Sequence, residues 1–191
     1  MTFDASHWDE RYSGAERIWS VEPNQFVAAA LSELPPGRAV DLAAGEGRNA
    51  VWLASLGWDV TAVDFSGVAI GRGRDQDDTV TWVVGDVLTV PLPADLDLAL
   101  ISYLHLPHDE MEQVVRRAVA ALAPGGTFFL VCHDASNPAE GVGGPQNPAV
   151  LVDAARVTGW LDDAEVVEAG RVERHVEAGT AYDVRVLATK I

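Results

Sequence analysis

The segment that decides the fold is RAVDLAAGEGRNAVWLASLGWDVTAVDFS, residues 38–66. It begins with a short apolar run that contains Asp41 near its end, and it continues through a turn of small residues, 43–47. A segment with helical spacing follows, and a second apolar run, residues 60–63, ends in Asp64. This order predicts a strand, a glycine loop, a helix and a second strand with an acid at its end. Such a unit binds a nucleotide-like cofactor at the loop and places the second acid on a ribose.

The rest of the chain continues the alternation of strands and helices. Three further strand-like runs and three helical patterns follow from the spacing of apolar residues: strands at 79–84, 96–101 and 127–132, and helices at 23–34, 108–122 and 150–158. Two final strand-like runs, 164–172 and 182–188, have no helix between them and should pair as an antiparallel hairpin. We therefore expect one α/β domain over residues 1–191, a Rossmann-like three-layer sandwich with a seven-stranded, mostly parallel sheet and an antiparallel C-terminal hairpin.

Two segments are less regular than this pattern. Gly67, Gly71 and Gly73 weaken the helix that the segment 66–78 should form, because glycine is a poor helix former. Residues 133–148 are rich in glycine, proline and asparagine. A loop of ~15 residues without structure is uncommon in a compact domain and often covers an active site. We therefore interpret residues 133–148 as an active-site loop.

Composition excludes several classes of function. The chain has 29 acidic and 13 basic residues and a net charge of -16, which repels phosphate backbones and anionic lipids. We therefore expect no nucleic-acid or membrane partner. The single cysteine, Cys132, permits no internal disulfide, and no cluster of His, Asp or Glu has metal-ligand spacing. The N-terminus is polar and acidic, unlike a signal peptide, so a cytoplasmic location is expected.

The glycine loop by itself is compatible with two cofactors. Gly45, Gly47 and Ala50 match the dinucleotide fingerprint G-x-G-x-x-G/A, so an NAD(P)-dependent oxidoreductase is one hypothesis. Asp41 argues against it, because a carboxylate at that strand end would repel a pyrophosphate but could bind an ammonium group. Asp86, after the third strand, places another acid near an adenine edge. A protein that binds a cofactor without catalysis is a further alternative.

These features resemble the class I S-adenosylmethionine-dependent methyltransferases. The first motif of that family is an acid-x-G-x-G-x-G loop, which VDLAAGEG fits in outline, and its fold has seven strands with an antiparallel seventh. The chain is most similar to a small bacterial branch related to tellurite-resistance and thiopurine methyltransferases. Four motifs carry this closer match: HWDERY at 7–12, GEGRNAVWLA at 45–54, GWDVTAVDFS at 57–66, and HD..N with GGPQ across 133–146.

The resemblance implies S-adenosylmethionine as cofactor and assigns roles around it. Gly45 and Gly47 would let the backbone approach the methionine part, and Asp41 would orient its amino group. Asp64 would accept both ribose hydroxyls, and Asp86 the adenine amino group, because carboxylates are acceptors. Each acid has an alternative role as the cap of a turn or helix. The full predicted cofactor set is Asp41, Ala43, Gly45, Gly47, Arg48, Asn49, Asp64, Phe65, Ser66, Asp86, Val87, Ser102, Tyr103 and Tyr12.

The chain departs from the family in two places. The first loop glycine of the family is Ala43 here, and the added methyl group narrows the approach of the backbone to the cofactor. The segment 66–78 is short and rich in glycine, which puts the wall on the cofactor side in question.

The expected reaction is methyl transfer to a small-molecule acceptor of thiol, selenium, tellurium or phenol type. Transfer from a sulfonium needs mainly proximity, alignment and exclusion of water. A thiol or phenol must also lose a proton, which a histidine can accept, whereas an acceptor that is already anionic needs no base. His105, His133 and Tyr12 are the predicted catalytic residues, with Trp19 beside the substrate. Residues 1–22 would form a lid, and the protein would be a monomer or homodimer.

Overall fold

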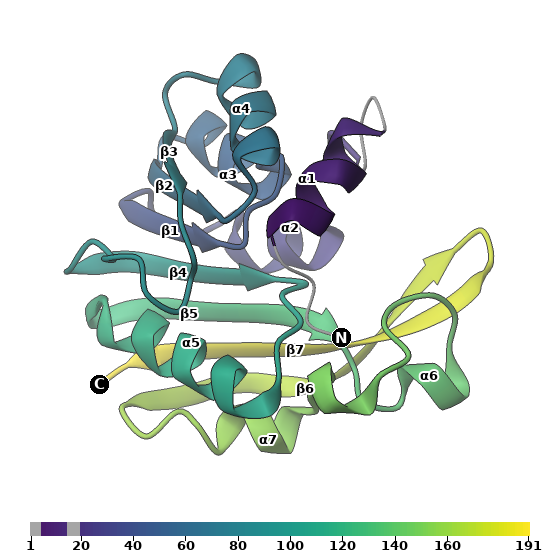
Figure 1. Ribbon diagram of the computed structural model, residues 1–191. Helices are drawn as coiled ribbons and strands as arrows, with labels where there is room; N and C mark the ends of the chain where they lie inside the picture. Colours follow the sequence, from purple (N-terminus) through teal and green to yellow (C-terminus); the bar gives the residue numbers. More distant parts are fainter. Residues whose placement is uncertain (1–4, 15–19) are drawn as a thin grey trace.

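The computed structural model describes residues 5–14 and 20–191, and it shows a seven-stranded sheet with helices on both faces (Figure 1). The strands lie in the order β3-β2-β1-β4-β5-β7-β6. They are β1 Arg38–Leu42, β2 Asp59–Asp64, β3 Thr81–Val84, β4 Leu96–Ser102, β5 Leu122–His133, β6 Ala164–Val176 and β7 Gly179–Lys190. The helices are α1 Ala5–Ser13, α2 Gln25–Leu31, α3 Arg48–Ser55, α4 Gly67–Gln76, α5 His108–Ala120, α6 Asn137–Glu140, the 3₁₀ turn η1 Pro148–Val150 and α7 Ala154–Thr158.

The first five strands are parallel, and β7 runs antiparallel to both β5 and β6. The predicted fold class, a mostly parallel sheet that ends in an antiparallel hairpin, is therefore confirmed. The hairpin is longer than its sequence pattern indicated. The last residue of β5, His133, pairs with Asp183, so the tip of the β6–β7 hairpin runs past the end of β5 (Figure 1).

Two apolar cores lie on opposite faces of the sheet. On one face α5 packs through Met111, Val114, Val115 and Ala118, whose spacing of three and four residues defines one side of a helix. On the other face the buried residues come from α2, α3 and α4, with Leu53 of α3 among them. The parallel strands are buried on both faces, which is why their sequences are nearly continuous apolar runs.

The doubt about the helix after β2 was wrong, because α4 forms. Ser66 caps it, and its side-chain oxygen accepts a hydrogen bond from the Ala69 backbone N–H at 3.1 Å. One of the unfavourable glycines has a packing role. A Cβ atom on Gly73 would lie 2.3 Å from the Trp82 ring, and one on Gly47 would lie 2.1 Å from the same ring. The indole therefore occupies space that larger residues in the loop and in α4 would fill.

The segment 133–148 is an ordered connection that is tied to β7. It contains the short helix α6, and Asn137 in that helix is fully buried. The Asn137 Nδ2 donates to the Gly143 carbonyl at 2.9 Å, and its Oδ1 accepts from the Tyr182 N–H at 2.8 Å. These two bonds hold the turn against the sheet edge, where Gly144 lies directly over the His133 ring.

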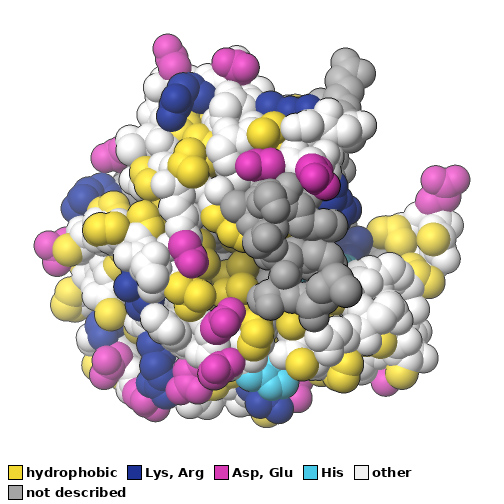
Figure 2. All heavy atoms as spheres, in the orientation of Figure 1, with side chains coloured by type: hydrophobic (Ala, Val, Ile, Leu, Met, Phe, Trp, Pro, Cys, Tyr) yellow, Lys and Arg dark blue, Asp and Glu magenta, His cyan; other side chains and the backbone are white. Residues whose placement is uncertain are grey.

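On the face that Figure 2 shows, basic side chains are interspersed among acidic ones, so neither charge dominates that face. In the described part of the chain, no helix is long and apolar enough to cross a membrane.

Candidate functional site

The carboxyl ends of β1 to β5 meet at one edge of the sheet, and most predicted site residues lie there. Asp41, Asp64 and His133 come from the ends of β1, β2 and β5, and Ser102 ends β4. In open α/β sheets this edge is where ligands bind.

The glycine loop follows β1 and turns through three residues with left-handed backbone. Ala43, Gly45 and Gly47 have φ values of 61°, 58° and 82°. Glycine adopts this conformation without steric cost, whereas alanine does so at a cost of about 1–2 kcal/mol. A glycine would therefore suit position 43, and Ala43 raises the free energy of the folded state by about that amount.

Asp41 is a buried acid of the site whose carboxylate lacks well-aligned hydrogen-bond partners in the described part of the chain. Asp41 is 1% exposed, and neither carboxylate oxygen has a partner in good hydrogen-bond geometry among the described residues. Burial, and then the nearby Asp64, raise the pKa of Asp41 to about 7, while Arg48 and, more weakly, the backbone N–H of Ala50 act in the opposite direction. An ammonium group placed here would relieve the cost of the buried carboxylate.

Asp64 binds the loop from the end of β2. Its Oδ2 accepts from the Gly45 N–H at 2.8 Å, and its Oδ1 accepts from the Ser66 N–H at 2.9 Å. Burial raises its pKa, although these two bonds oppose the shift. Each carboxylate oxygen has a further lone pair for a hydroxyl group, so the predicted ribose contact and the capping role are compatible.

Three other predicted cofactor residues lie after β2 and β3. Asp86 is exposed, and its Oδ1 accepts from the Leu88 N–H at 2.9 Å, as a turn cap does. Val87 beside it is 8% exposed, and Phe65 is half-buried after β2. The adenine contact of Asp86 stays a prediction, since one of its oxygens has the alternative, capping role.

Arg48 and Asn49 open α3 directly after the glycine loop. Arg48 Nη1 donates to Ser20 Oγ at 3.2 Å. Burial lowers the pKa of Arg48, and the neighbouring Tyr103 and Asp41 oppose that shift. Asn49 is 4% exposed, and its Oδ1 accepts from the Asn24 N–H at 2.9 Å. Arg48 therefore lies in the site, whereas the side-chain oxygen of Asn49 is bonded to the cap of α2.

The described part of the N-terminal segment lies against the cofactor side of the sheet edge. Asp9 of α1 accepts hydrogen bonds from Ser66 Oγ at 2.5 Å and from the Val68 N–H at 3.3 Å. Tyr12 is 3% exposed, and its ring centroid lies 5.9 Å from that of Trp8. Trp19 lies outside the described residues. The lid role of residues 1–22 stays a prediction.

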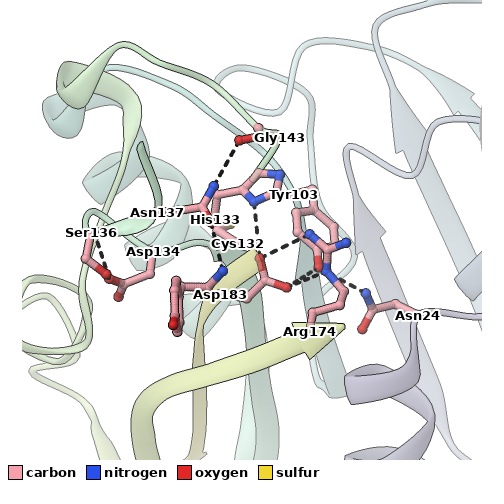
Figure 3. A network of polar contacts seen from close by, with 12 residues as sticks. Asn24, Tyr103, Cys132, His133, Asp134, Ser136, Asn137, Gly143, Arg174 and Asp183 are labelled. Carbon is pink, nitrogen blue, oxygen red and sulfur yellow. Dashed lines mark hydrogen bonds and ion pairs between the residues drawn. The ribbon is translucent and has the colours of Figure 1, made fainter. Parts of the chain in front are cut away.

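Five polar side chains form a second part of the site, which we call the polar cluster and which Figure 3 shows in part. Its members are Tyr103, His105, His133, Arg174 and Asp183. Asp183 is fully buried at the centre. Its Oδ2 accepts from the Tyr103 hydroxyl at 2.6 Å and from Arg174 Nε at 2.7 Å. His133 Nδ1 lies 3.2 Å from Asp183 Oδ1, at ion-pair distance but without the alignment of a good hydrogen bond.

The two predicted catalytic histidines are neighbours with different surroundings. Their rings stack with centroids 5.4 Å apart and planes 21° apart. Burial, and then His133, lower the pKa of His105 to about 3, so His105 is neutral at ordinary pH. Its Nε2 is buried and has no partner among the described residues. His133 instead lies beside the carboxylate of Asp183.

Three residues of this site were not predicted from the sequence: Asn24, Arg174 and Asp183. The β-sheet register brings Asp183 opposite His133 on β5 and opposite Val172 on β6. Arg174 lies two residues beyond Val172, on the same face and within reach of Asp183. A signal was present, because Asp183 is the one acid in the strand-like run 182–188.

Known proteins resemble this chain in sequence and in fold. Residues 39–126 match the family described as a methyltransferase domain. A demethylmenaquinone methyltransferase of Clavibacter sepedonicus is 31% identical over 133 residues, which are 65% of this chain and 51% of that protein. A ubiquinone/menaquinone biosynthesis C-methyltransferase UbiE of a Caulobacter species is 30% identical over 144 residues, 68% of this chain and 55% of that protein. The chain thus spans about half the length of these curated relatives.

Solved structures show the same fold at lower identity. A structure from a study of the conversion of a disulfide bond into a thioacetal group during echinomycin biosynthesis has a TM-score of 0.80 at 18% identity, over 97% of this chain and 91% of that one. TehB from Haemophilus influenzae has a TM-score of 0.75 at 17% identity, over 98% of this chain and 67% of that one.

The predicted resemblance to the class I S-adenosylmethionine-dependent methyltransferases is confirmed. Residues 39–126 match the family described as a methyltransferase domain, and the chain has the fold of the solved structures named above. The matched family and the relatives named above are methyltransferases, so the comparisons favour that class over the NAD(P)-dependent oxidoreductase hypothesis. The cofactor that this family implies is S-adenosylmethionine. The unpartnered Asp41 carboxylate fits its ammonium group, and Asp64 retains lone pairs for a diol.

Proposed function

We propose that the protein transfers the methyl group of S-adenosylmethionine to a small-molecule acceptor whose nucleophilic atom loses a proton to His133. The observation that carries this proposal is the unpartnered, buried Asp41 carboxylate at the same sheet edge as the polar cluster. The Asp41 carboxylate suits the ammonium group of an amino acid. The polar cluster suits an acceptor that must be deprotonated.

The residues of the glycine loop would bind and orient the cofactor. Asp41 would pair with the ammonium group and Arg48 with the carboxylate, while Asp64 would accept from the ribose hydroxyls. S-adenosylmethionine supplies an activated methyl group on a sulfonium, so the protein need not activate the donor. Residues of α1 and the segment 133–148 would exclude water from this edge of the sheet.

The two histidines would have separate roles in the reaction. His133 would accept the proton, because Asp183 at 3.2 Å stabilises the imidazolium that forms. His105 is too weak a base for this task, since its pKa is about 3. Its unpartnered Nε2 would instead accept a hydrogen bond from the acceptor. Tyr12, buried in α1, would line the site rather than move a proton.

Two acceptor classes have specific support. The aromatic walls of Tyr103, His105 and His133 and the names of the quinone-biosynthesis relatives favour a phenol-type acceptor. The structural neighbour from the study of disulfide conversion favours a thiol. A selenium or tellurium species would use the same site if it arrived protonated.

Calorimetric titration tests the cofactor before any acceptor is known. We expect S-adenosylhomocysteine to bind with micromolar affinity, and NAD and NADP not to bind. Methyl transfer would then be measured with tritiated S-adenosylmethionine and three probes: benzenethiol, phenol and hydrogen selenide. Cofactor binding without transfer to any probe, at any pH between 6 and 9, would favour the non-catalytic alternative. Failure to bind S-adenosylhomocysteine would refute the proposal.

A further inference from the structure

Asp183 connects three strands through side-chain contacts, and this makes it the centre of the polar cluster (Figure 3). Tyr103 and Arg174 both donate to Oδ2, while Oδ1 lies 3.2 Å from His133 Nδ1. A second guanidinium nitrogen of Arg174, Nη2, lies 3.5 Å from Oδ1. A fully buried carboxylate requires such partners, because its charge is costly to remove from water.

Tyr103 is held in one orientation from both sides. Its hydroxyl donates to Asp183 and accepts from Asn24 Nδ2 at 3.3 Å. The Asn24 N–H donates in turn to Asn49 in the first turn of α3. Through these bonds the first turn of α3, directly after the glycine loop, is linked to the polar cluster.

The backbone of Tyr103 is strained in a way that serves this placement. Its φ of 57° is unusual for a residue with a Cβ atom. Burial, and then the adjacent Asp183 carboxylate, raise the pKa of its phenol. The hydroxyl therefore keeps its proton and remains a donor to Asp183.

We propose that Tyr103 is a positioning residue which, through Asp183, sets how strongly His133 holds the proton that it takes from the acceptor. The inference rests on the proposed role of His133 as the base. A hydrogen bond from Tyr103 withdraws negative charge from Asp183, so the carboxylate stabilises the imidazolium of His133 less strongly. His133 then releases its proton more readily after it has taken one from the acceptor.

The other groups around His133 can also change its proton affinity. Arg174 from β6 acts in the same direction as Tyr103, because it neutralises Asp183. His105, which stacks on the ring, is uncharged. Gly144 covers the ring with backbone only, and the neighbouring Cys132 has its pKa raised by burial to about 12, so it is a thiol.

The covalent step is balanced within the proposed reaction. A lone pair on the acceptor atom forms a bond to the methyl carbon, and the carbon–sulfur bond breaks with its electron pair kept by sulfur. The products are the methylated acceptor and S-adenosylhomocysteine. The proton of the acceptor ends on His133 and leaves to water.

The test compares Tyr103→Phe with the wild-type protein. Removal of the hydroxyl should raise the pKa of His133 by about one unit, a tenfold increase in its proton affinity. In single-turnover methyl transfer, the acid limb of the pH–rate profile should move to higher pH by the same amount. S-adenosylhomocysteine affinity should stay within about twofold. A uniform loss of rate with an unmoved acid limb would overturn the proposal.

Two further variants keep the test decisive if Tyr103→Phe folds poorly. Glu173→Ala removes an exposed acid of the same hairpin that lies outside the polar cluster, so the acid limb should stay in place. Arg174→Gln should move the limb in the same direction as Tyr103→Phe, since it also exposes His133 to more carboxylate charge. An acid limb that is unmoved in both Tyr103→Phe and Arg174→Gln would contradict the role of Asp183 as the link.

The pKa of His133 can also be measured without any acceptor. Proton NMR of the imidazole C–H signals, assigned with His133→Asn, gives this pKa in wild type and variants. If no probe is methylated but Tyr103→Phe raises the pKa of His133, the coupling stands and the proposed function fails. If a probe is methylated but Tyr103→Phe leaves the pKa of His133 unchanged, the proposed function stands and the coupling through Asp183 fails.

Discussion

The two halves of the site are built by different means. On the cofactor side, polar side chains lie within 46 residues of one another, from Asp41 to Asp86, and Asp64 is bonded to backbone N–H groups. In the polar cluster, side chains bond to side chains, and the residues are spread from Tyr103 to Asp183. One half therefore depends on loop geometry, and the other on the register of three strands. Variants in each half should fail in different ways.

The largest effect is expected in the polar cluster. Asp183→Ala leaves Arg174 half-buried without its ionic partner, so the free energy of unfolding should fall by about 3–5 kcal/mol. Glu173→Ala, an exposed acid of the same hairpin, is the control and should change it by about 0.5 kcal/mol or less. Urea denaturation followed by circular dichroism measures both. Equal, small losses would show that Asp183 does not hold the cluster together.

The cofactor side should impose a pH dependence on the stability of the cofactor-free protein. The pKa of Asp41 is raised from 3.8 to about 7 in the folded state, so the folded protein binds a proton more tightly than the unfolded chain. Its contribution to stability is greatest below pH 4, falls as the pH rises from about 4 to 7, and is constant above that. Denaturation curves of wild type and Asp41→Asn should diverge across this window. Parallel curves would mean that Asp41 is not strained by burial.

Asp41→Asn should change stability and cofactor binding in opposite directions. At pH 8 the wild-type carboxylate is ionised, and its loss should weaken S-adenosylhomocysteine binding by about 1.5–3 kcal/mol, the scale of a hydrogen bond to a charged group. The same variant should unfold at a higher temperature without ligand, since a buried, unpartnered charge is removed. Asp59→Asn, at the exposed start of β2, changes the net charge equally and should alter neither quantity. Calorimetry and thermal melts give both results.

The smallest effect is expected in the loop backbone. Ala43→Gly relieves a left-handed alanine, which favours the folded state by about 1–2 kcal/mol. The greater freedom of glycine in the unfolded chain offsets part of this gain, so a net increase of about 0.5–1 kcal/mol is expected. Ala44→Gly is the matched control, because Ala44 is not among the residues with positive φ, and it should destabilise. A loss of stability in both variants would mean that position 43 carries no strain.

Much of the cofactor side could be predicted from the sequence alone. Asp41 and Asp64 were found because each lies at the end of an apolar run, and the strand–loop–helix order brings their ends to one edge. Short apolar runs and helical spacing also predicted the seven strands and the antiparallel hairpin, because both are local properties of the chain.

Tertiary structure decided what depended on distant neighbours. Helix α4 forms despite its glycines, and the indole of Trp82 from β3 fills the space beside Gly73. His105 and His133 looked equivalent in sequence, yet burial makes one a very weak base while a carboxylate 50 residues away lies beside the other. Asp183 and Arg174 meet His133 only through the pairing of β5, β7 and β6. Spacing along the chain carries no information about such contacts, because register and burial are set by the packing of the whole sheet.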